Sequence, residues 1–400
     1  MTYVHELSSK LESHREEITS WMQNKRAEVP IPIYGSVDIR DAGWKVGVVD
    51  ANHFPAGFNN TAEEDRSTLS KLLREHIERR HPRCEWVHLY PEEHTRNQGY
   101  VENISTIQSL IRDAGYRCTV GSPELEEFGS LKGISGPLKL NEVQLSENNE
   151  ILVEGKKPDF ILLNNDLTGG TLPGLKSPNV SPPPEMGWHH RRKSEHYEAL
   201  QPYVNEVAEM LEIDPWHLMP EWFVSENKCL IEDACRQKLA LEIDAFLDRI
   251  QQKYTALGIE RKPAVVMKND SGTYGLGIIV LHSGNEIINL SNRKANKLSY
   301  AKGGVDVENF LIQEGIPTIM VTEDEEPVEP VVYLIDGEAA SWFYRINPKR
   351  SDMDNLNSPS ARFEPLGEKK IRFGEHAHGW HALLAELSML AMGAESLNRR

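Results

Sequence analysis

Residues 263–281, PAVVMKNDSGTYGLGIIVL, carry the strongest fold signal in the chain. The apolar stretch at 264–267 predicts a strand that runs into Lys268, and the apolar stretch at 278–281 predicts a second strand. The turn-rich loop between them is glycine-rich, so its backbone can approach a phosphate group without a Cβ in the way. The ammonium group of Lys268 would add a point charge to the same phosphates. The segment therefore predicts a β-hairpin with a phosphate-binding loop.

Two familiar phosphate-binding loops fit this segment poorly. A Walker loop places its lysine after the glycines and opens a helix, whereas here Lys268 precedes the glycines and a strand follows them. A dinucleotide-binding fingerprint spaces its glycines differently and also opens a helix. The remaining alternative is an ordinary glycine-containing hairpin that binds no ligand.

The composition is that of a soluble globular protein. Hydrophobic residues make up 39% of the 400 residues and charged residues 26%, and this length predicts two or three domains with a large core. The 61 acidic residues outnumber the 44 basic ones, so the formal net charge is −17. Because a globally acidic surface repels phosphate backbones, we expect no nucleic-acid partner. A small anionic ligand in a local basic pocket is compatible with this charge.

The sequence predicts neither a membrane span nor a secretion signal. No stretch reaches the roughly 18 consecutive apolar residues that a span needs, and the first residues resemble an amphipathic helix rather than a signal peptide. The four cysteines, Cys84, Cys118, Cys229 and Cys235, show no C-x-x-C pair and no zinc-type spacing. We therefore expect a cytoplasmic protein with reduced thiols and no membrane contact.

Strands and helices alternate in the first third of the chain. Apolar runs predict strands at residues 44–49, at 86–89 and from 116 onward, and periodic stretches predict helices at 63–80 and 101–114. This alternation is typical of an α/β domain with a largely parallel sheet, to which we assign residues 1–130.

The rest of the chain divides into a central segment and a C-terminal part. Residues 131–258 contain a small hairpin and a buried strand within 140–166, a loop rich in Pro and Gly, and helices over 194–258. Residues 259–400 return mainly to strands. There the segment LIQEGIP at 311–317 predicts a short strand, and residues 328–346 predict a hairpin that turns at Asp336-Gly337.

The hairpin at 263–281, the strand at 311–317 and the segment 329–366 together resemble an ATP-grasp enzyme, with the layout of glutathione synthetase. The resemblance implies an α/β protein in which residues 259–400 form the ATP-grasp nucleotide-binding part behind an N-terminal α/β substrate domain. It also implies that Lys268 contacts phosphate and that Arg345 faces the reacting phosphoryl group, so both are candidate catalytic residues. The implied lid and adenine-binding residues are Gly272, Thr273, Tyr274, Gly275 and Gly277 for the lid, and Gln313, Glu314 and Ile316 for the adenine hinge.

The whole chain, from about residue 5 to residue 397, resembles a narrower group. The blocks VDIRDAGWKVGVVDANHFPAGFNN (37–60), GWHHRRKSEHY (187–197) and MKNDSGTYGLGI (267–278) are similar to the proteobacterial type of glutamate–cysteine ligase. The resemblance implies ATP-dependent joining of the γ-carboxylate of L-glutamate to L-cysteine through an acyl phosphate, which is the first step of glutathione synthesis. ATP and Mg²⁺ are the implied cofactors, and small molecules are the implied partners.

Two other functions are compatible with the sequence. One is another ATP-grasp ligase with a different amine acceptor, including the glutathione synthetase step, because the glycine hairpin serves only ATP. The other is a non-catalytic nucleotide-binding regulator on the same fold.

Metal ligands are expected in the segment RSDMDNLNSPS at 350–360. Carboxylate and amide oxygens suit Mg²⁺, which makes Asp352, Asp354 and Asn355 the candidates, with Asn357 beside them. Glutathione synthetase places its ligands on two strands of a longer C-terminal segment. Since the chain after residue 357 is shorter here, Asp336 or Glu338 is the alternative.

Substrate contacts are expected where predicted strands end, because ligands of open α/β sheets lie at the carboxyl ends of strands. Arg40 is a candidate partner for a substrate carboxylate, and Asp38 or Asp41 is a candidate partner for an amino group. A basic patch at 189–193 is a further candidate, for a glutamate carboxylate or an ATP phosphate, against the alternative of a solvated helix start. The assigned substrate-binding residues are Arg40, Asp50, Asn52, Asn59, Asn60, Asn165, Arg191 and Arg192.

Overall fold

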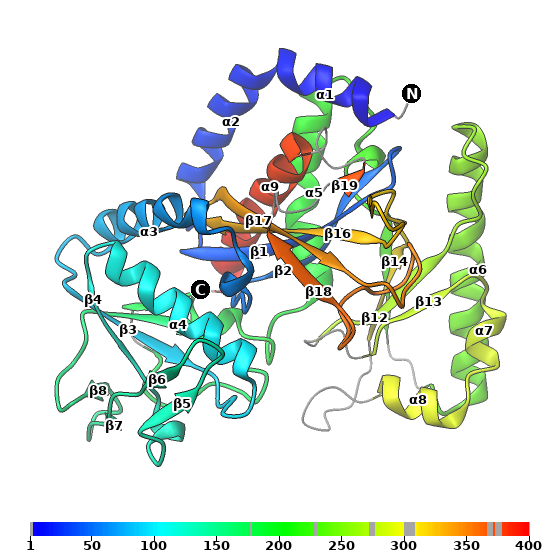
Figure 1. Cartoon of the computed structure of the whole chain (residues 1–400). Coiled ribbons are helices and arrows are strands. Elements are labelled where there is room, and N and C mark those ends of the chain that lie inside the picture. The colour runs from blue at the N-terminus through cyan, green and yellow to red at the C-terminus, as the bar shows by residue number, and fades with distance from the viewer. Residues whose placement is uncertain are drawn as a thin grey trace.

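The computed structural model shows a mixed α/β protein with three main sheets (Figure 1). It describes residues 3–176, 178–226, 230–271, 277–299, 309–365, 371–372 and 378–399. None of the helices in these ranges is long and apolar enough to cross a membrane.

The first sheet is antiparallel and joins strands from both ends of the chain. Its order is β18-β17-β16-β1-β2. The N-terminal strand β1 pairs with the C-terminal strand β16, and in this pairing Val37 lies opposite Val332. Its strands are β1 (Tyr34–Asp41), β2 (Val46–Asn52), β16 (Val328–Ile335), β17 (Glu338–Ile346) and β18 (Arg362–Pro365).

The placement of β2 corrects one expectation. The strand predicted at 44–49 exists, but it belongs to an antiparallel sheet and not to a parallel one. The partner sequence of β1 lies almost 300 residues away, and the local alternation of strands and helices carries no information about such a pairing. The predicted hairpin turn at Asp336-Gly337 is confirmed, with positive φ angles of 54° and 82° at these two residues.

Helices cover one face of this sheet and form a large core with it. Helix α9 (His378–Asn398) contacts β1, β2, β16 and β17, and it packs against α5 (Lys193–Met210). Most side chains of α9 are buried, which agrees with a helix that is apolar on several faces. Helices α1 (Tyr3–Ser13) and α2 (Arg15–Glu28) pack against the same core, as expected for the predicted amphipathic N-terminus.

The second sheet is parallel and confirms the predicted strand–helix–strand alternation. Its order is β10-β9-β3-β4, and α4 (Gln98–Asp113) connects β3 to β4. In Figure 1 α3 (Arg66–Arg80) and α4 lie together over this part of the molecule. The strands are β3 (Trp86–Pro91), β4 (Arg117–Val120), β9 (Phe160–Asn164) and β10 (Val180–Ser181), with the small hairpins β5 (Ser130–Lys132)/β6 (Pro137–Lys139) and β7 (Val143–Leu145)/β8 (Ile151–Val153).

The third sheet contains the hairpin on which the sequence analysis is based. Strand β12 (Val265–Asn269) pairs antiparallel with β13 (Ile279–Leu281), as predicted. The sheet order is β11-β14-β12-β13, with β11 (Trp222–Ser225) and β14 (Phe310–Glu314). The remaining elements are α6 (Asp233–Ala256), α7 (Asn285–Ile288), α8 (Asn292–Ser299), β15 (Val321–Thr322), β19 (Ile371–Arg372) and the short 3₁₀ helices Phe58–Asn60, Glu63–Asp65, Pro123–Leu125, Pro184–Met186 and Pro215–His217.

The predicted helical region over 194–258 contains a strand that the sequence analysis missed. Strand β11 interrupts it and forms an edge of the third sheet, where Trp222 pairs with Gln313. The division into residues 1–130, 131–258 and 259–400 stays a prediction, and the first sheet draws strands from the first and last of these ranges.

Candidate active site

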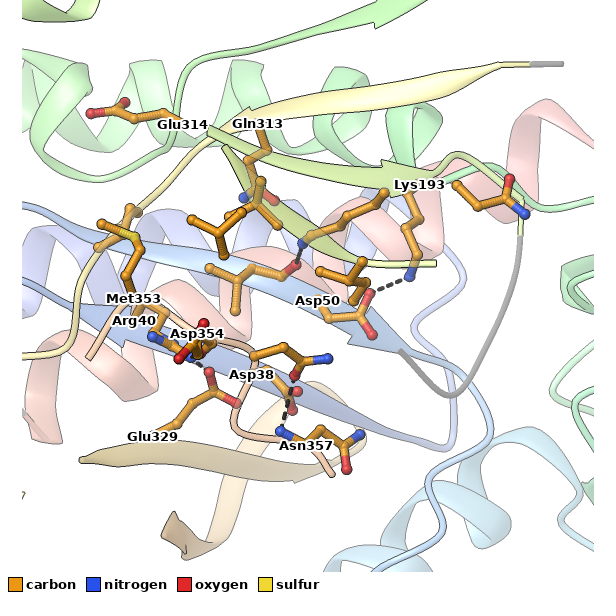
Figure 2. A pocket seen from close by; sticks show the side chains of 18 residues that line it. Asp38, Arg40, Asp50, Lys193, Gln313, Glu314, Glu329, Met353, Asp354 and Asn357 are labelled. Atoms are coloured by element: carbon orange, nitrogen blue, oxygen red, sulfur yellow. Dashed lines mark hydrogen bonds and ion pairs between the residues drawn. The ribbon is translucent and has the colours of Figure 1, made fainter. Parts of the chain in front are cut away.

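A cavity lies between the third sheet and the first sheet. It encloses about 850 Å³ of empty space, its open mouth included, and Figure 2 shows its lining. Apolar side chains of β12 and β13 form one wall, and charged side chains of β1, β2 and β16 form the opposite one. The lining residues are Asp38, Arg40, Val49, Asp50, Lys193, Val266, Lys268, Asn269, Ile278, Val280, Gln313, Glu314, Ile316, Glu329, Met353, Asp354, Asn355 and Asn357.

A second cavity adjoins the first. It encloses about 1510 Å³ and lies between the first sheet and the residues that follow β3 and β9 of the parallel sheet. Arg345 of β17 lines this cavity, as do Glu92 and His94, which follow β3. Asp38, Asp50 and Asn357 line both cavities, so the two meet at these three residues.

Lys268 lies on β12 inside the first cavity, where the sequence predicted a phosphate lysine. Its side chain is 6% exposed, and its Nζ donates a hydrogen bond to the carbonyl oxygen of Val49 at 2.6 Å. That carbonyl is available because the register between β1 and β2 shifts at Asp38/Ile39 and leaves Val49 unpaired. Burial lowers the pKa of Lys268 to about 8, although the charge of Asp50 opposes the shift.

Asp50, which lines both cavities, forms an ion pair with Lys193. The Lys193 Nζ lies 2.6 Å from Asp50 Oδ1 and 4.4 Å from the ring centroid of Trp188. Burial alone would raise the pKa of Asp50, but the charges of Lys193 and Lys268 outweigh it and hold the pKa below its usual value. Lys193, which the assigned site residues did not include, is the member of the basic patch that lines the first cavity.

Two arginines contact the same buried carboxylate, that of Glu329 on β16. Arg40 Nε and Arg345 Nη1 each contact a different oxygen of Glu329, and Arg345 Nη1 also lies 2.7 Å from Asp38 Oδ2. Burial would raise the pKa of Glu329, but the two guanidinium charges hold it below its usual value. The Nε of Arg345, a residue only 7% exposed, has no hydrogen-bond partner in the described part of the chain.

The predicted adenine-hinge residues all line the first cavity. The Gln313 side chain donates a hydrogen bond to the Tyr197 hydroxyl at 2.9 Å, and its Oε1 has no partner among the described residues. The carboxylate of Glu314 points away from the other labelled side chains (Figure 2) and pairs with Lys45. Burial lowers the pKa of Lys45 to about 8, although the carboxylate of Glu314 opposes the shift. Ile316 contributes an apolar side chain.

Of the predicted metal ligands, Asp354 and Asn355 line the first cavity. The lining does not include Asp352, whose carboxylate pairs with Arg261 at 2.7 and 3.1 Å. The alternatives lie elsewhere, since Asp336 pairs with His76 at 2.6 Å and Glu338 with Arg26 at 3.4 Å. Among the residues that the structure describes, no group of three or more His, Cys, Asp or Glu side chains is placed to hold a metal ion.

The predicted substrate residues divide into two groups. Arg40 lines the first cavity, Asn52, Asn59 and Asn60 line the second, and Asp50 lines both. Neither lining includes Asn165, Arg191 or Arg192. Asn165 bonds to the backbone of Pro91 and Leu167, and Arg192 Nη1 bonds to the carbonyls of His190 and Arg191. The lid residues 272–275 lie outside the described ranges, and Gly277 has a positive φ of 78°.

Arg191 belongs to a buried network. Its Nε and Nη2 lie 2.7 and 3.1 Å from the carboxylate of Glu395 on α9, and its Nη1 donates to the carbonyl of Ala51. His196 Nδ1 also lies 2.6 Å from Glu395 Oε1. The side chains of Arg191 and Glu395 are nearly inaccessible to solvent. The network connects Glu395 of α9 to α5 through His196 and to the end of β2 through the Arg191–Ala51 bond.

We therefore expect Arg191→Ala to lower the free energy of unfolding by about 3–5 kcal/mol, because it leaves Glu395 charged and buried without its main partner. Urea denaturation measures the change, with Arg192→Ala as the matched control because the side chain of Arg192 bonds to two backbone carbonyls rather than to a buried carboxylate in the part of the chain that the structure describes. The substrate role predicted for Arg191 gains support instead if Arg191→Ala unfolds like the wild type and loses glutamate affinity.

Some residues of the site were not predicted from the sequence. Glu329 is the one charged residue in the apolar run VEPVVYLI of β16. A single charge in a buried strand is a sequence signal that could have identified it as a site residue. The pair of Glu92 and His94, 2.7 Å apart, follows β3 and carries no such signal.

Comparisons with known proteins give a family match and a strong structural match. Residues 8–395 match the family model described as glutamate-cysteine ligase. A crystal structure from Methylobacillus flagellatus KT, provisionally assigned as γ-glutamylcysteine synthetase, superposes with a TM-score of 0.89 at 29% identity and covers 100% of this chain and 97% of that one. No curated protein matches the sequence significantly.

Two more distant structures also match. A glutathione synthetase-like effector from Globodera pallida has a TM-score of 0.39 at 9% identity, covering 91% of this chain and 82% of that one. D-alanyl-alanine synthetase A from Vibrio cholerae has a TM-score of 0.28 at 10% identity, covering 70% and 74%. Likenesses at these TM-scores carry no argument about this chain.

Proposed function

Since the chain belongs to the glutamate–cysteine ligase family, we propose that it joins the γ-carboxylate of L-glutamate to the amine of L-cysteine with conversion of ATP to ADP and phosphate. The match confirms the resemblance seen in the sequence, and with it a ligase activity in glutathione biosynthesis. The observation that carries the proposal is the meeting of two cavities at Asp38, Asp50 and Asn357. One cavity combines apolar side chains with two lysines, which suits a nucleotide, and the other is large enough for the amino acids.

We assign ATP to the first cavity and infer an ATP-grasp fold. The support is a cavity enclosed between two antiparallel sheets, with a buried lysine on the strand before the glycine-rich loop. The apolar side chains of Val266, Ile316 and Met353 would accommodate adenine. Lys268 and Lys193 flank Asp50, where the cavities meet, and they would bind the phosphates.

The residues of the first cavity fit Mg²⁺ carried by the nucleotide. Asp354, Asn355 and Asn357 supply hard oxygen donors, and they would hold the ion. The four other carboxylates that line the cavity already pair with Lys or Arg, which suits an ion that is bound mainly through phosphate oxygens and water. Bound there, Mg²⁺ would neutralise charge on the phosphates during transfer.

We assign the remaining steps to this chain's own residues. The γ-carboxylate of glutamate would lie where the cavities meet, so that its oxygen attacks the terminal phosphorus of ATP. The bond from that phosphorus to the β-phosphate oxygen breaks, ADP leaves, and the carboxylate becomes an acyl phosphate. Arg345, on the second-cavity side, would stabilise the charge on the transferring phosphoryl group through its donors. ATP supply is compatible with a cytoplasmic location, as are the free thiols of Cys84, Cys118 and Cys235.

Purified protein is expected to release ADP only when ATP, Mg²⁺, glutamate and cysteine are all present, and to form γ-glutamylcysteine in equal amount. A coupled ADP assay and mass spectrometry of the product measure this, with omission of each substrate as the control. Turnover with γ-glutamylcysteine plus glycine and none with glutamate plus cysteine would overturn the proposal. Tight ATP binding without ADP release for any amino-acid pair would indicate a regulator.

The affinity for ATP is expected to fall as pH rises above about 8, the lowered pKa of Lys268. Below that pH the lysine is charged and attracts the phosphates, and above it the lysine is neutral, so the attraction is lost. Titration calorimetry with a non-hydrolysable ATP analogue on both sides of this pH measures the change. The assignment is contradicted if Lys268→Met retains the same pH dependence.

A further inference from the structure

The second half of the proposed reaction needs a proton acceptor. At neutral pH the acceptor amine is mostly an ammonium ion, which has no lone pair with which to attack an acyl phosphate. The base must reach the nitrogen at the position of attack, which is where the two cavities meet. Asp38, Asp50 and Asn357 line both cavities, and only the first two are carboxylates.

Asp50 is poorly suited to accept a proton. Its Oδ1 pairs with Lys193 at 2.6 Å, and although burial opposes the effect, the charges of Lys193 and Lys268 hold its pKa below the usual value. Glu92 and Asp166 line the second cavity alone, and Glu92 pairs with His94 at 2.7 Å.

Asp38 is fixed in position and has one oxygen available. Its Oδ2 accepts a hydrogen bond from Arg345 Nη1 at 2.7 Å, whereas its Oδ1 accepts none from any residue that the structure describes. The side chain is 19% exposed, so it is reachable from the cavities. It lies opposite Asp50 at the register shift between β1 and β2, and shifts of this kind redirect side chains at active sites.

The surroundings of Asp38 favour a carboxylate that takes up a proton readily. Burial raises its pKa, the charge of Arg345 lowers it, and the nearby charge of Glu329 raises it again, with a net increase. A general base is most effective when its pKa approaches the working pH, so the net increase makes Asp38 a better base than an exposed aspartate.

We propose that Asp38 is the general base that deprotonates the acceptor amine, an inference that rests on the proposed function. The ammonium gives one proton to Asp38 Oδ1 and becomes a neutral amine. The nitrogen lone pair then forms the C–N bond with the acyl carbon, and the C–O bond to the phosphate breaks. The departing phosphate takes the second proton, the amide keeps the third, and Asp38 returns its proton to water.

The variant Asp38→Asn tests this assignment, because asparagine can still accept the hydrogen bond from Arg345 but cannot take up a proton. With glutamate and cysteine, turnover is expected to fall by about 10²-fold. With glutamate and hydroxylamine, a nucleophile that is already neutral at neutral pH, hydroxamate formation is expected to stay near the wild-type rate. Urea denaturation of the variant checks that it is folded.

Asp50→Asn serves as the matched comparison. It removes the partner of Lys193 in the first cavity, so it is expected to lower turnover with cysteine and with hydroxylamine in the same proportion. Equal losses with both acceptors for Asp38→Asn would overturn the proposal and place Asp38 in phosphoryl transfer. An unchanged rate with cysteine would also overturn it.

A measurement on the wild type keeps the proposal testable if the variant does not fold. The cysteine-dependent turnover number is expected to decrease on the acid side of its pH profile as Asp38 becomes protonated, whereas turnover with hydroxylamine over the neutral range is expected to change little. Identical profiles would contradict the proposal. Failure of the wild type to use cysteine at all would overturn the proposed function instead, so the two failures are distinguishable.

Discussion

Replacing Arg345 by alanine is expected to lower the turnover number by about 10³-fold and to leave the affinity for ATP little changed. Arg345 lines the second cavity and not the first, so it lies on the side of the acyl group and away from the nucleotide. Its buried Nε has no partner in the described residues, and its Nη1 is held by Asp38 and Glu329. A donor oriented in this way stabilises charge that builds up only during transfer.

Single-turnover ADP formation at saturating ATP measures this loss. Arg345→Lys is the control, since it retains the charge and loses the planar fork of donors. Glu329 keeps its contact with Arg40 in both variants, which limits the structural damage. If Arg345→Ala lowers only the free energy of unfolding and turns over like the wild type, Arg345 is a counter-ion for Asp38 and Glu329 and no more.

The second large effect is expected for Lys268→Ala, which should lower phosphoryl transfer by about 10²-fold to 10³-fold and weaken ATP binding. The change removes a cation from the wall of the first cavity next to Asp50. Stability should change little, because Nζ makes one hydrogen bond to the described residues, to the carbonyl of Val49, and burial of its charge is itself unfavourable.

Equilibrium binding of ATP and a urea titration separate the two effects. Lys262→Ala is the matched control, because Lys262 is exposed and precedes the same strand. Loss of folded protein at unchanged ATP affinity would show that Lys268 is structural and would remove the phosphate-binding role of the hairpin.

Local sequence patterns predicted much of the fold. The β12–β13 hairpin, the turn at Asp336-Gly337 and the β3–α4–β4 unit each depend on neighbouring residues, so apolar runs and turn residues reveal them. The pairing of β1 with β16 was not predictable from such patterns, because the paired strands are remote in sequence and their apolar runs suit many partners. Strand β11 has only four residues between two helices, too few for a clear period.

Site residues were predictable where a charged residue directly follows a predicted strand in the same segment. Lys268 and Asp50 each end an apolar run, and both line a cavity. Arg191 and Arg192 carried the same charge signal, but the sequence does not show that Arg191 pairs with Glu395, which is 204 residues away. A charge pattern therefore identified candidate residues, and only the fold could separate cavity residues from buried ion pairs.

The fate of the γ-carboxylate oxygens of glutamate tests the central claim most directly. L-Glutamate labelled with ¹⁸O in its γ-carboxylate is incubated with the protein, ATP, Mg²⁺ and cysteine, and mass spectrometry follows the label. Activation as an acyl phosphate predicts that each γ-glutamylcysteine formed transfers one ¹⁸O atom to inorganic phosphate. Phosphate without ¹⁸O, or label in AMP, would contradict phosphoryl transfer to glutamate where the two cavities meet.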